Sequence, residues 1–190
     1  MEIDVGKRTA TWSSENRVSA WSGVAAGLGI AVPGGVEAFV GETAGTSLVL
    51  AVTPALAVPL LVVLHRGQAE VAGRFGVVAY LVNLIGLGLF GGAAFSLNAV
   101  LFFTGVKPAG PSVVMLLGSA VVFAVGSVLF GVSMLRARVY PVVPVWGYTV
   151  LLAVFAVAAR LPDGVLTSVL HVGVGASLVW LAVAAHARPA

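Results

Sequence analysis

The chain has no cysteine and very little charge, and these two absences exclude several classes of protein. Of its 190 residues, 9% are Asp, Glu, Lys or Arg and 59% are apolar. An ordinary soluble domain has about 25% charged residues, which form much of its polar surface. The missing cysteines exclude disulfides, thiol redox chemistry and cysteine metal sites. Because no polar shell is available to cover the apolar surface, that surface must face lipid.

Motifs for catalysis, metal binding and nucleotide binding are absent as well. The chain has three histidines, too few for the iron-dependent membrane oxygenases, and it lacks H-E-x-x-H, G-x-S-x-G and G-x-x-x-x-G-K-[ST]. Both aspartates, Asp4 and Asp163, lie in polar segments, which argues against an intramembrane aspartyl protease. The sequence therefore predicts no catalytic residue, no metal and no cofactor, although an unfamiliar enzyme is left open.

The net charge of +3 does not indicate a nucleic-acid partner. The basic residues stand singly at the ends of apolar runs and form no basic stripe. We therefore predict that the partner of this chain is the lipid bilayer. A second copy of the chain or another membrane protein is left open as a further partner.

Long apolar runs separated by short polar connections dominate the sequence. A bilayer core of about 30 Å needs about 20 helical residues, and β-barrel strands would instead alternate apolar and polar residues. The sequence therefore predicts an all-α polytopic membrane bundle of about six transmembrane helices over residues 18–187. Residues 1–17 are expected to be a mostly disordered cytoplasmic tail, and residues 188–190 a short C-terminal tail. The six runs are Val18–Val40, Thr46–Leu64, Phe75–Phe103, Pro111–Leu135, Tyr140–Ala159 and Gly164–Ala185.

The distribution of basic residues predicts the orientation of these helices. Short loops that carry Lys and Arg stay in the cytoplasm. With both termini inside, Lys107 and Arg160 lie outside, and the inner segments hold Lys7, Arg8, Arg17, Arg66, Arg74, Arg136, Arg138 and Arg188. The preference for arginine over lysine, with abundant Ala, Val and Gly, indicates a bacterial genome rich in GC. We therefore expect a multi-pass protein of the bacterial plasma membrane.

Small residues and prolines within the runs predict where helices pack and where they break. Small residues four positions apart lie on one helix face and allow close helix contacts, within one chain or between two copies; the contact within one chain is the commoner case. We expect breaks or kinks at Pro33-Gly34-Gly35, Pro54 and Pro59. The long third run is expected to tilt, bend at Gly91-Gly92 or extend beyond the membrane. The small-residue pairs are Gly23 and Gly27, Gly88 and Gly92, Ser127 and Gly131, and Gly173 and Ser177.

Polar residues on five of the predicted helices share one depth in the outer leaflet. The first hypothesis is a polar pocket open to the outside, in which Glu37 and His171 form a proton-linked or ligand-binding pair. Activity would then depend on pH between about 5 and 7, where a histidine near its reference pKa changes charge. The alternative is that Glu37 lies among the lipid headgroups and the others hydrogen-bond between helices. The residues of this layer are Glu37, Thr53, Asn98, Ser119 and His171.

Two stretches resemble small six-span membrane proteins that are common in actinobacteria. They are RFGV at 74–77 through Gly91-Gly92, and LFGVSMLRARVYP at 129–141, which Trp146 follows. The resemblance implies the membrane architecture and transfers no active site.

Three hypotheses of function follow from the polar layer. The first is a transporter-like or ligand-binding bundle with an outward-facing polar site. The second is a membrane enzyme acting on a lipid-like substrate, with Glu37 and His171 as acid and base. The third is a structural or accessory subunit of a membrane assembly.

Overall fold

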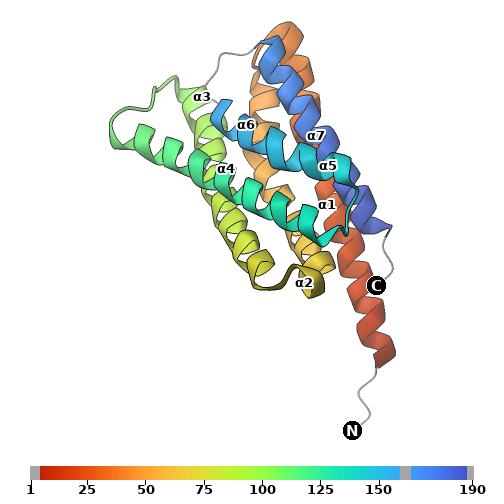
Figure 1. The fold of residues 1–190 in the computed structure, drawn as a ribbon. Coiled ribbons are helices and arrows are strands. Elements are labelled where there is room, and N and C mark those ends of the chain that lie inside the picture. The colour runs from red at the N-terminus through yellow and green to blue at the C-terminus, as the bar shows by residue number, and fades with distance from the viewer. Residues whose placement is uncertain (1–4, 159–163, 188–190) are drawn as a thin grey trace.

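The computed structural model describes residues 5–158 and 164–187, and every regular element in these residues is a helix. The all-α prediction is therefore confirmed. The π-helical segments η1 (Ser96–Leu101) and η2 (Gly147–Leu151) join α2 to α3 and α5 to α6. The α-helices, labelled in Figure 1, are α1 (Val5–Val40), α2 (Ala44–Phe95), α3 (Phe102–Thr104), α4 (Pro111–Ala137), α5 (Val142–Trp146), α6 (Leu152–Ala158) and α7 (Val165–His186).

Four helical stretches in the described residues are long and apolar enough to cross a membrane. They are Ser14–Val40, Ala44–Thr104, Pro111–Ala137 and Val165–His186. The run Val142–Ala158 is apolar but shorter. The large exposed side chains on these helices are mostly Val, Leu, Ile, Phe and Trp, as expected for a surface in contact with lipid. The chain is thus a helical membrane protein.

Helix α2 is a hairpin of two arms and not one straight helix. A straight helix of its 52 residues would be about 78 Å long, more than twice the thickness of a bilayer core. Gly73 interrupts it with φ 55° and ψ −155°, a conformation that only glycine adopts readily. His65 stacks on Tyr80 with ring centroids 4.1 Å apart, which places the two arms side by side. We call the arms α2a (44–72) and α2b (74–95); Figure 1 shows the chain reversing between them.

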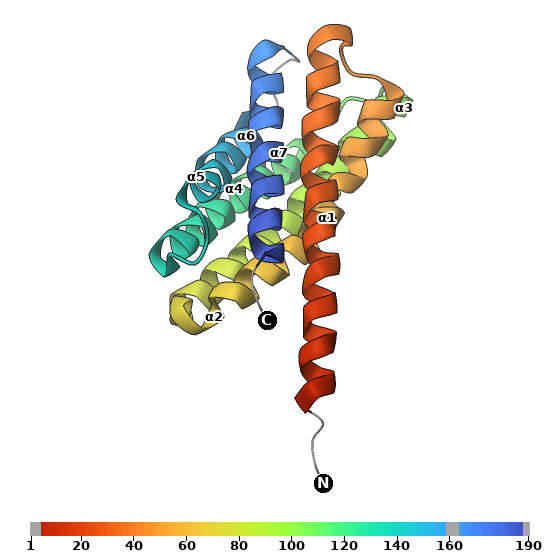
Figure 2. The ribbon, with the colours of Figure 1, turned by 90° about the vertical axis from the view of Figure 1, so that its right-hand side faces the viewer.

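The helical segments close into a ring. Helix α1 packs against α2a and α7, α2b packs against α4, and the run from α5 to α6 packs against both α4 and α7. Glycines bring the neighbouring backbones close together: a Cβ atom on Gly27 would lie 2.6 Å from the Gly175 carbonyl oxygen. Figure 2 shows α7 beside α1. Because α7 contacts α1, the last helix closes the ring begun by the first.

Three of the four predicted small-residue pairs lie at helix contacts, and one does not. Gly23 lies against Leu60 and Ala182. On α4, Gly131 lies against Thr149 and Ser127 bonds to Asn83 of α2b. On α7, Gly173 and Ser177 lie against Leu151 and Gly147. The prediction for Gly88 and Gly92 is wrong, because nothing lies within 4 Å of a Cβ atom at either position. Gly86 makes the contact with α4 instead. Residues 86 and 88 differ by about 200° around a helix, so they face opposite sides.

Helix breaks do not occur at the predicted proline and glycine positions, and a kink at these positions stays a prediction. Helix α1 continues through Pro33-Gly34-Gly35, and Gly73 is the residue with non-helical dihedral angles inside α2, so Pro54, Pro59 and Gly91-Gly92 do not interrupt it. A proline removes one backbone hydrogen bond, and packing against neighbouring helices holds the rest of the helix. The long third run continues through the π-helical segment η1.

Helix α1 also begins earlier than expected. It starts at Val5, so the prediction that residues 1–17 are mostly disordered is wrong for 5–17; residues 1–4 lie outside the described residues. Extending an existing helix by one residue is far easier than starting a new one, so the apolar part of α1 carries the polar segment with it. Glu15 on this segment forms an ion pair with Arg66, with 3.4 Å between nitrogen and oxygen.

The glycine contact between α2b and α4 can be tested with a matched pair of alanine variants. In Gly86→Ala the new Cβ atom would lie 2.6 Å from the Phe123 Cα atom. We expect this variant to lose about 1–3 kcal/mol of stability by overpacking. Gly88→Ala has the same change in helix propensity and meets open space, so it should melt at or above the wild-type temperature. Thermal unfolding in one detergent measures both variants. Equal melting temperatures would contradict the assigned contact.

Candidate functional site

A cavity of about 880 Å³ lies inside the ring. Side chains from α1, both arms of α2, η1, α4, the run from α5 to α6 and α7 line it, and most of them are apolar. It extends to the end of the bundle that carries the connections 41–43 and 105–110, since Glu42 and Pro108 line it. We call this the Glu37 end. Toward the opposite end, which contains Gly73, the buried side chains of Phe130, Met134 and Leu181 fill the ring.

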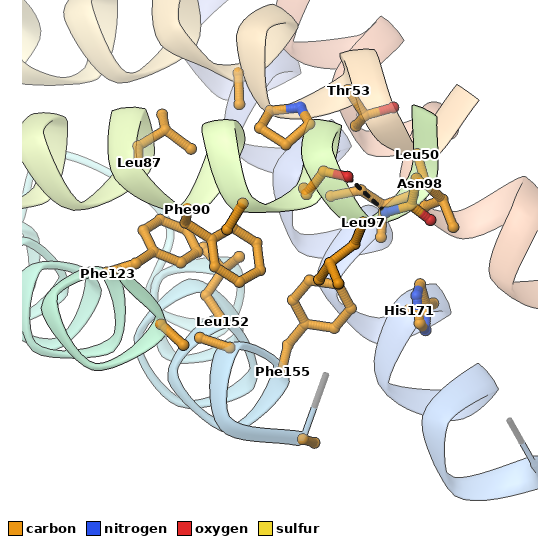
Figure 3. A pocket seen from close by; sticks show the side chains of 18 of the residues that line it. Leu50, Thr53, Leu87, Phe90, Leu97, Asn98, Phe123, Leu152, Phe155 and His171 are labelled. Carbon is orange, nitrogen blue, oxygen red and sulfur yellow. Dashed lines mark hydrogen bonds between the residues drawn. The ribbon is translucent and has the colours of Figure 1, made fainter. Parts of the chain in front are cut away.

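The structure brings four of the five predicted site residues to this cavity. Glu37, Thr53, Asn98 and His171 line it, and they come from α1, α2a, η1 and α7. Figure 3 shows three of them around the same space. Ser119 does not line the cavity; it is buried on α4, and its hydroxyl donates to the Leu116 carbonyl oxygen at 2.7 Å. Four of the five side chains for which the sequence predicts a shared depth therefore line one cavity.

Three of these side chains are held by their own helices and not by neighbouring ones. The Thr53 hydroxyl donates to the Val49 carbonyl oxygen at 2.7 Å, and the Asn98 amide donates to the Ala94 carbonyl oxygen at 2.9 Å. Ser119 follows the same pattern. The alternative that these residues hydrogen-bond between helices is therefore wrong for them. Asn98 keeps its side-chain oxygen and its second N–H for another partner.

His171 has a defined orientation. Its Nδ1 atom lies 2.7 Å from the Thr167 carbonyl oxygen, which only accepts, so Nδ1 carries a proton. Its ring meets Phe155 edge-on, with centroids 4.8 Å apart. On the other side the His171 side chain lies directly against Gly34 of α1, where a Cβ atom would collide with it.

Glu37 lies one helical turn beyond Gly34 on α1, about 4.5 Å along the axis. Its side chain is 7% exposed and lines the cavity. Glu37 is therefore not exposed on the outer surface of the bundle. Its depth relative to the lipid headgroups stays a prediction. Glu37 and His171 therefore approach one cavity from the facing sides of α1 and α7.

Both π-helical segments place a polar side chain at the cavity wall. Asn98 belongs to η1 and Tyr148 to η2, and both line the cavity. A π-helical turn holds one residue more than an α-helical turn and is frequently found at functional sites. The sequence pattern does not distinguish a π-turn from an α-turn, so these two segments were not predicted.

Sequence reasoning also missed Glu42 and the aromatic wall. Glu42 is exposed in the connection after α1, lines the cavity and accepts a hydrogen bond from the Ser47 hydroxyl. Its position directly after a predicted span, at the same end as Glu37, is the signal that could have identified it. Phe90 stacks on Phe123 with ring centroids 4.8 Å apart, and Phe155 meets Phe90 at 6.2 Å (Figure 3). Among uniformly apolar residues no pattern marks these rings.

A buried polar network crosses the ring on the side of the cavity nearer Gly73. The Asn83 amide on α2b donates to the Tyr148 hydroxyl, and the Ser127 hydroxyl on α4 donates to the Asn83 side-chain oxygen at 3.3 Å. Asn83 and Ser127 have no exposed surface. These bonds join α2b, α4 and η2, so the network fixes the relative positions of three of the segments that surround the cavity.

The histidines and carboxylates do not assemble into a metal site in the described residues. No group of three or more His, Asp or Glu side chains there lies close enough to hold an ion. His65 stacks on Tyr80, and His186 faces Trp21 with ring centroids 6.2 Å apart.

The buried network can be tested with a double-mutant cycle on Asn83→Ala and Tyr148→Phe. We expect a coupling free energy of about 0.6–1.7 kcal/mol, the range of hydrogen bonds between membrane helices. Unfolding of the single and double variants in one detergent measures this energy. Ser96→Ala is the control, because the Ser96 hydroxyl is exposed and bonds to its own helix at the Gly92 carbonyl oxygen. Strictly additive losses would show that Asn83 and Tyr148 do not interact.

Comparison of this chain with known proteins identified no relative. No protein-family model, no curated protein and no solved structure matches this chain. The function proposed below therefore rests on the composition, the ring and the cavity.

Proposed function

We propose that the chain is a six-span protein of a bacterial plasma membrane that binds a largely apolar small molecule in its central cavity. The observation that carries this proposal is the size and lining of the cavity. Its volume of about 880 Å³ falls in the range of about 300–1,000 Å³ typical of small-molecule sites. Such sites combine apolar walls with a few polar groups, and here those groups include Glu37, Asn98 and His171.

Six spans with both termini in the cytoplasm are supported by the hairpin at Gly73. The hairpin divides α2 into two arms, and the run Val142–Ala158 supplies a further crossing, shorter than the rest, that local thinning of the bilayer accommodates. The connections at the Gly73 end are rich in arginine, and the connection 105–110 at the Glu37 end contains Lys107. Positive residues favour the cytoplasm, so the cavity would open to the outside.

A second candidate is a membrane enzyme that acts on a lipid-like substrate. The observation that favours it is the orientation of His171, whose Nδ1 atom is held by Thr167, so that Nε2 is the ring nitrogen that would accept a proton. Glu37 lines the same cavity and would supply the acid. Incubation of the purified protein with bilayer lipid separates the two functions, because an enzyme changes the mass of its substrate and a binding protein returns it unchanged. A structural subunit has no need of a cavity of this size.

The orientation can be tested with reporter fusions at residue 190 and in the loop near Lys107. An enzyme that is active only outside the cytoplasm should be silent at residue 190 and active near Lys107, because the positive residues hold the other loops inside. Green fluorescent protein at residue 190 should fluoresce and provides the complementary control. Activity of the periplasmic reporter at residue 190 would overturn the proposed topology.

Ligand binding can be tested by filling the cavity. Ala93 and Ala120 line it, so Ala93→Phe and Ala120→Phe should each remove volume from the site. We expect each variant to weaken saturable binding of the neutral dye N-phenyl-1-naphthylamine by about tenfold, the effect of about 1.4 kcal/mol of steric conflict. Fluorescence of the dye in nanodiscs, corrected for empty nanodiscs, measures the binding.

The control variant is Ala25→Phe, which adds the same ring to the exposed face of α1. It should bind the dye as the wild type does. Absence of saturable binding by the wild-type protein would overturn the proposed function.

A further inference from the structure

We infer, on the basis of the proposed function, that the ligand is a neutral alcohol, whose hydroxyl group binds to Asn98 and His171 and whose apolar body contacts the aromatic wall. Three features of the described residues point to this class of ligand. They are the unused hydrogen-bonding groups of Asn98, the orientation of His171, and the phenylalanine rings that adjoin His171.

Asn98 offers the cavity both a donor and an acceptor. Its amide nitrogen donates to the Ala94 carbonyl oxygen at 2.9 Å, and a carbonyl oxygen only accepts, so this bond fixes which end of the carboxamide is the nitrogen. A carboxamide has two N–H donors and one oxygen, so one N–H and the oxygen remain for a ligand. Because Asn98 lines the cavity from η1, a ligand group that both donates and accepts would pair with it most completely.

His171 adds a polar contact whose role depends on the protonation of its ring. Thr167 holds Nδ1, so Nε2 is the ring nitrogen that remains for a ligand. This nitrogen accepts a hydrogen bond in the neutral ring and donates one in the charged ring. A hydroxyl group donates to the first form and accepts from the second, whereas an ether or carbonyl oxygen only accepts and an ammonium group only donates. The hydroxyl is therefore a small neutral group that fits Asn98 and both forms of His171.

The aromatic wall connects these polar groups to the apolar part of the cavity. Phe155 meets the His171 ring with centroids 4.8 Å apart and the Phe90 ring at 6.2 Å, and Phe90 stacks on Phe123 (Figure 3). Phe90 precedes Asn98 by about two helical turns, and both side chains line the cavity. Aromatic rings bury a large apolar area. A ligand whose hydroxyl lies at Asn98 and His171 therefore has rings beside its apolar body.

The cost of an unpaired polar group makes the hydroxyl decisive for affinity. A hydrocarbon of the same shape would displace water from Asn98 and His171 without replacing its hydrogen bonds, which costs free energy in apolar surroundings. A site built to bond a hydroxyl rejects the analogue that lacks it, whereas an apolar pocket discriminates only weakly between similar shapes. We therefore expect binding to depend on the hydroxyl more than on the shape of the ligand.

The experiment compares three probes that share one skeleton. They are 5-phenylpentan-1-ol, which donates and accepts, its methyl ether, which only accepts, and hexylbenzene, which does neither. Displacement of N-phenyl-1-naphthylamine from the full chain in nanodiscs of zwitterionic lipid measures their affinities. Each affinity is expressed per mole fraction of probe in the lipid, because the probes partition differently into the bilayer. We expect the wild type to bind the alcohol about tenfold more tightly than hexylbenzene and about threefold more tightly than the ether.

Substitution of the two polar residues identifies the source of the preference. Asn98→Leu replaces the carboxamide with an apolar group of similar size, and His171→Phe keeps a ring beside Phe155. Each variant should reduce the ratio of the alcohol affinity to the hexylbenzene affinity by about threefold or more. The affinity for hexylbenzene itself should not fall, and it reports that the cavity is intact. Ser119→Ala is the matched control, since the Ser119 hydroxyl also bonds to its own helix and does not line the cavity.

Each outcome supports or overturns the inference. A preference for the alcohol that falls in Asn98→Leu or His171→Phe and not in Ser119→Ala supports it. Three results overturn it while the proposed function stands, provided that the dye binds: equal affinities of the alcohol and either other probe, no displacement by any probe, or a preference that both variants leave unchanged. Absence of saturable binding by N-phenyl-1-naphthylamine and of any effect of the three probes overturns the inference together with the proposed function.

Discussion

The contact between the first and the last helix holds the ring closed, and the cavity exists only because the ring is closed. At this contact the backbones of α1 and α7 meet at Gly27 and Gly175, and His171 fits against Gly34. Lipid is as apolar as the side chains, so no hydrophobic effect drives the helices together. Close van der Waals packing supplies the attraction instead, and the missing side chains of Gly27 and Gly175 let the two backbones approach closely.

The polar residues of the bundle divide into two groups with different physical roles. Asn83, Ser127 and Tyr148 bond to one another across three helical segments, so they hold the ring together on the side of the cavity nearer Gly73. Asn98 bonds to its own helix, so no hydrogen bond of its side chain joins two segments of the ring. Thr53 also bonds to its own helix, but its side chain packs against Gly29 of α1. A polar group that the packing does not use and that lines a cavity is available to a ligand. This division is the physical basis for assigning the binding site to the Glu37 end.

Several features of the fold could be predicted from the apolar pattern, and the failures have identifiable causes. In lipid every backbone group must be hydrogen-bonded within its segment, so apolar runs of this length can only be helices. The same requirement explains why Pro33 does not break α1. Proline removes one backbone hydrogen bond, and the adjacent residues of α1 keep their own backbone hydrogen bonds. Gly88 and Gly92 were placed at a contact because of their spacing, but spacing does not say which side of a helix faces its neighbour. Gly86, two residues earlier, has that position.

The sequence by itself determined that this chain is a helical membrane protein, and it predicted that Glu37, Thr53, Asn98 and His171 share one depth. Both results follow from quantities that are local along the chain: the length of an apolar run and the distance of a residue from its end. The tertiary structure alone decided that Ser119 is excluded from the cavity, that Glu42 and three phenylalanines belong to it, and that two π-turns direct Asn98 and Tyr148 to its wall. These features depend on the rotation of each helix about its axis. That rotation is determined by side-chain packing between segments far apart in the chain, and a uniformly apolar sequence does not record it.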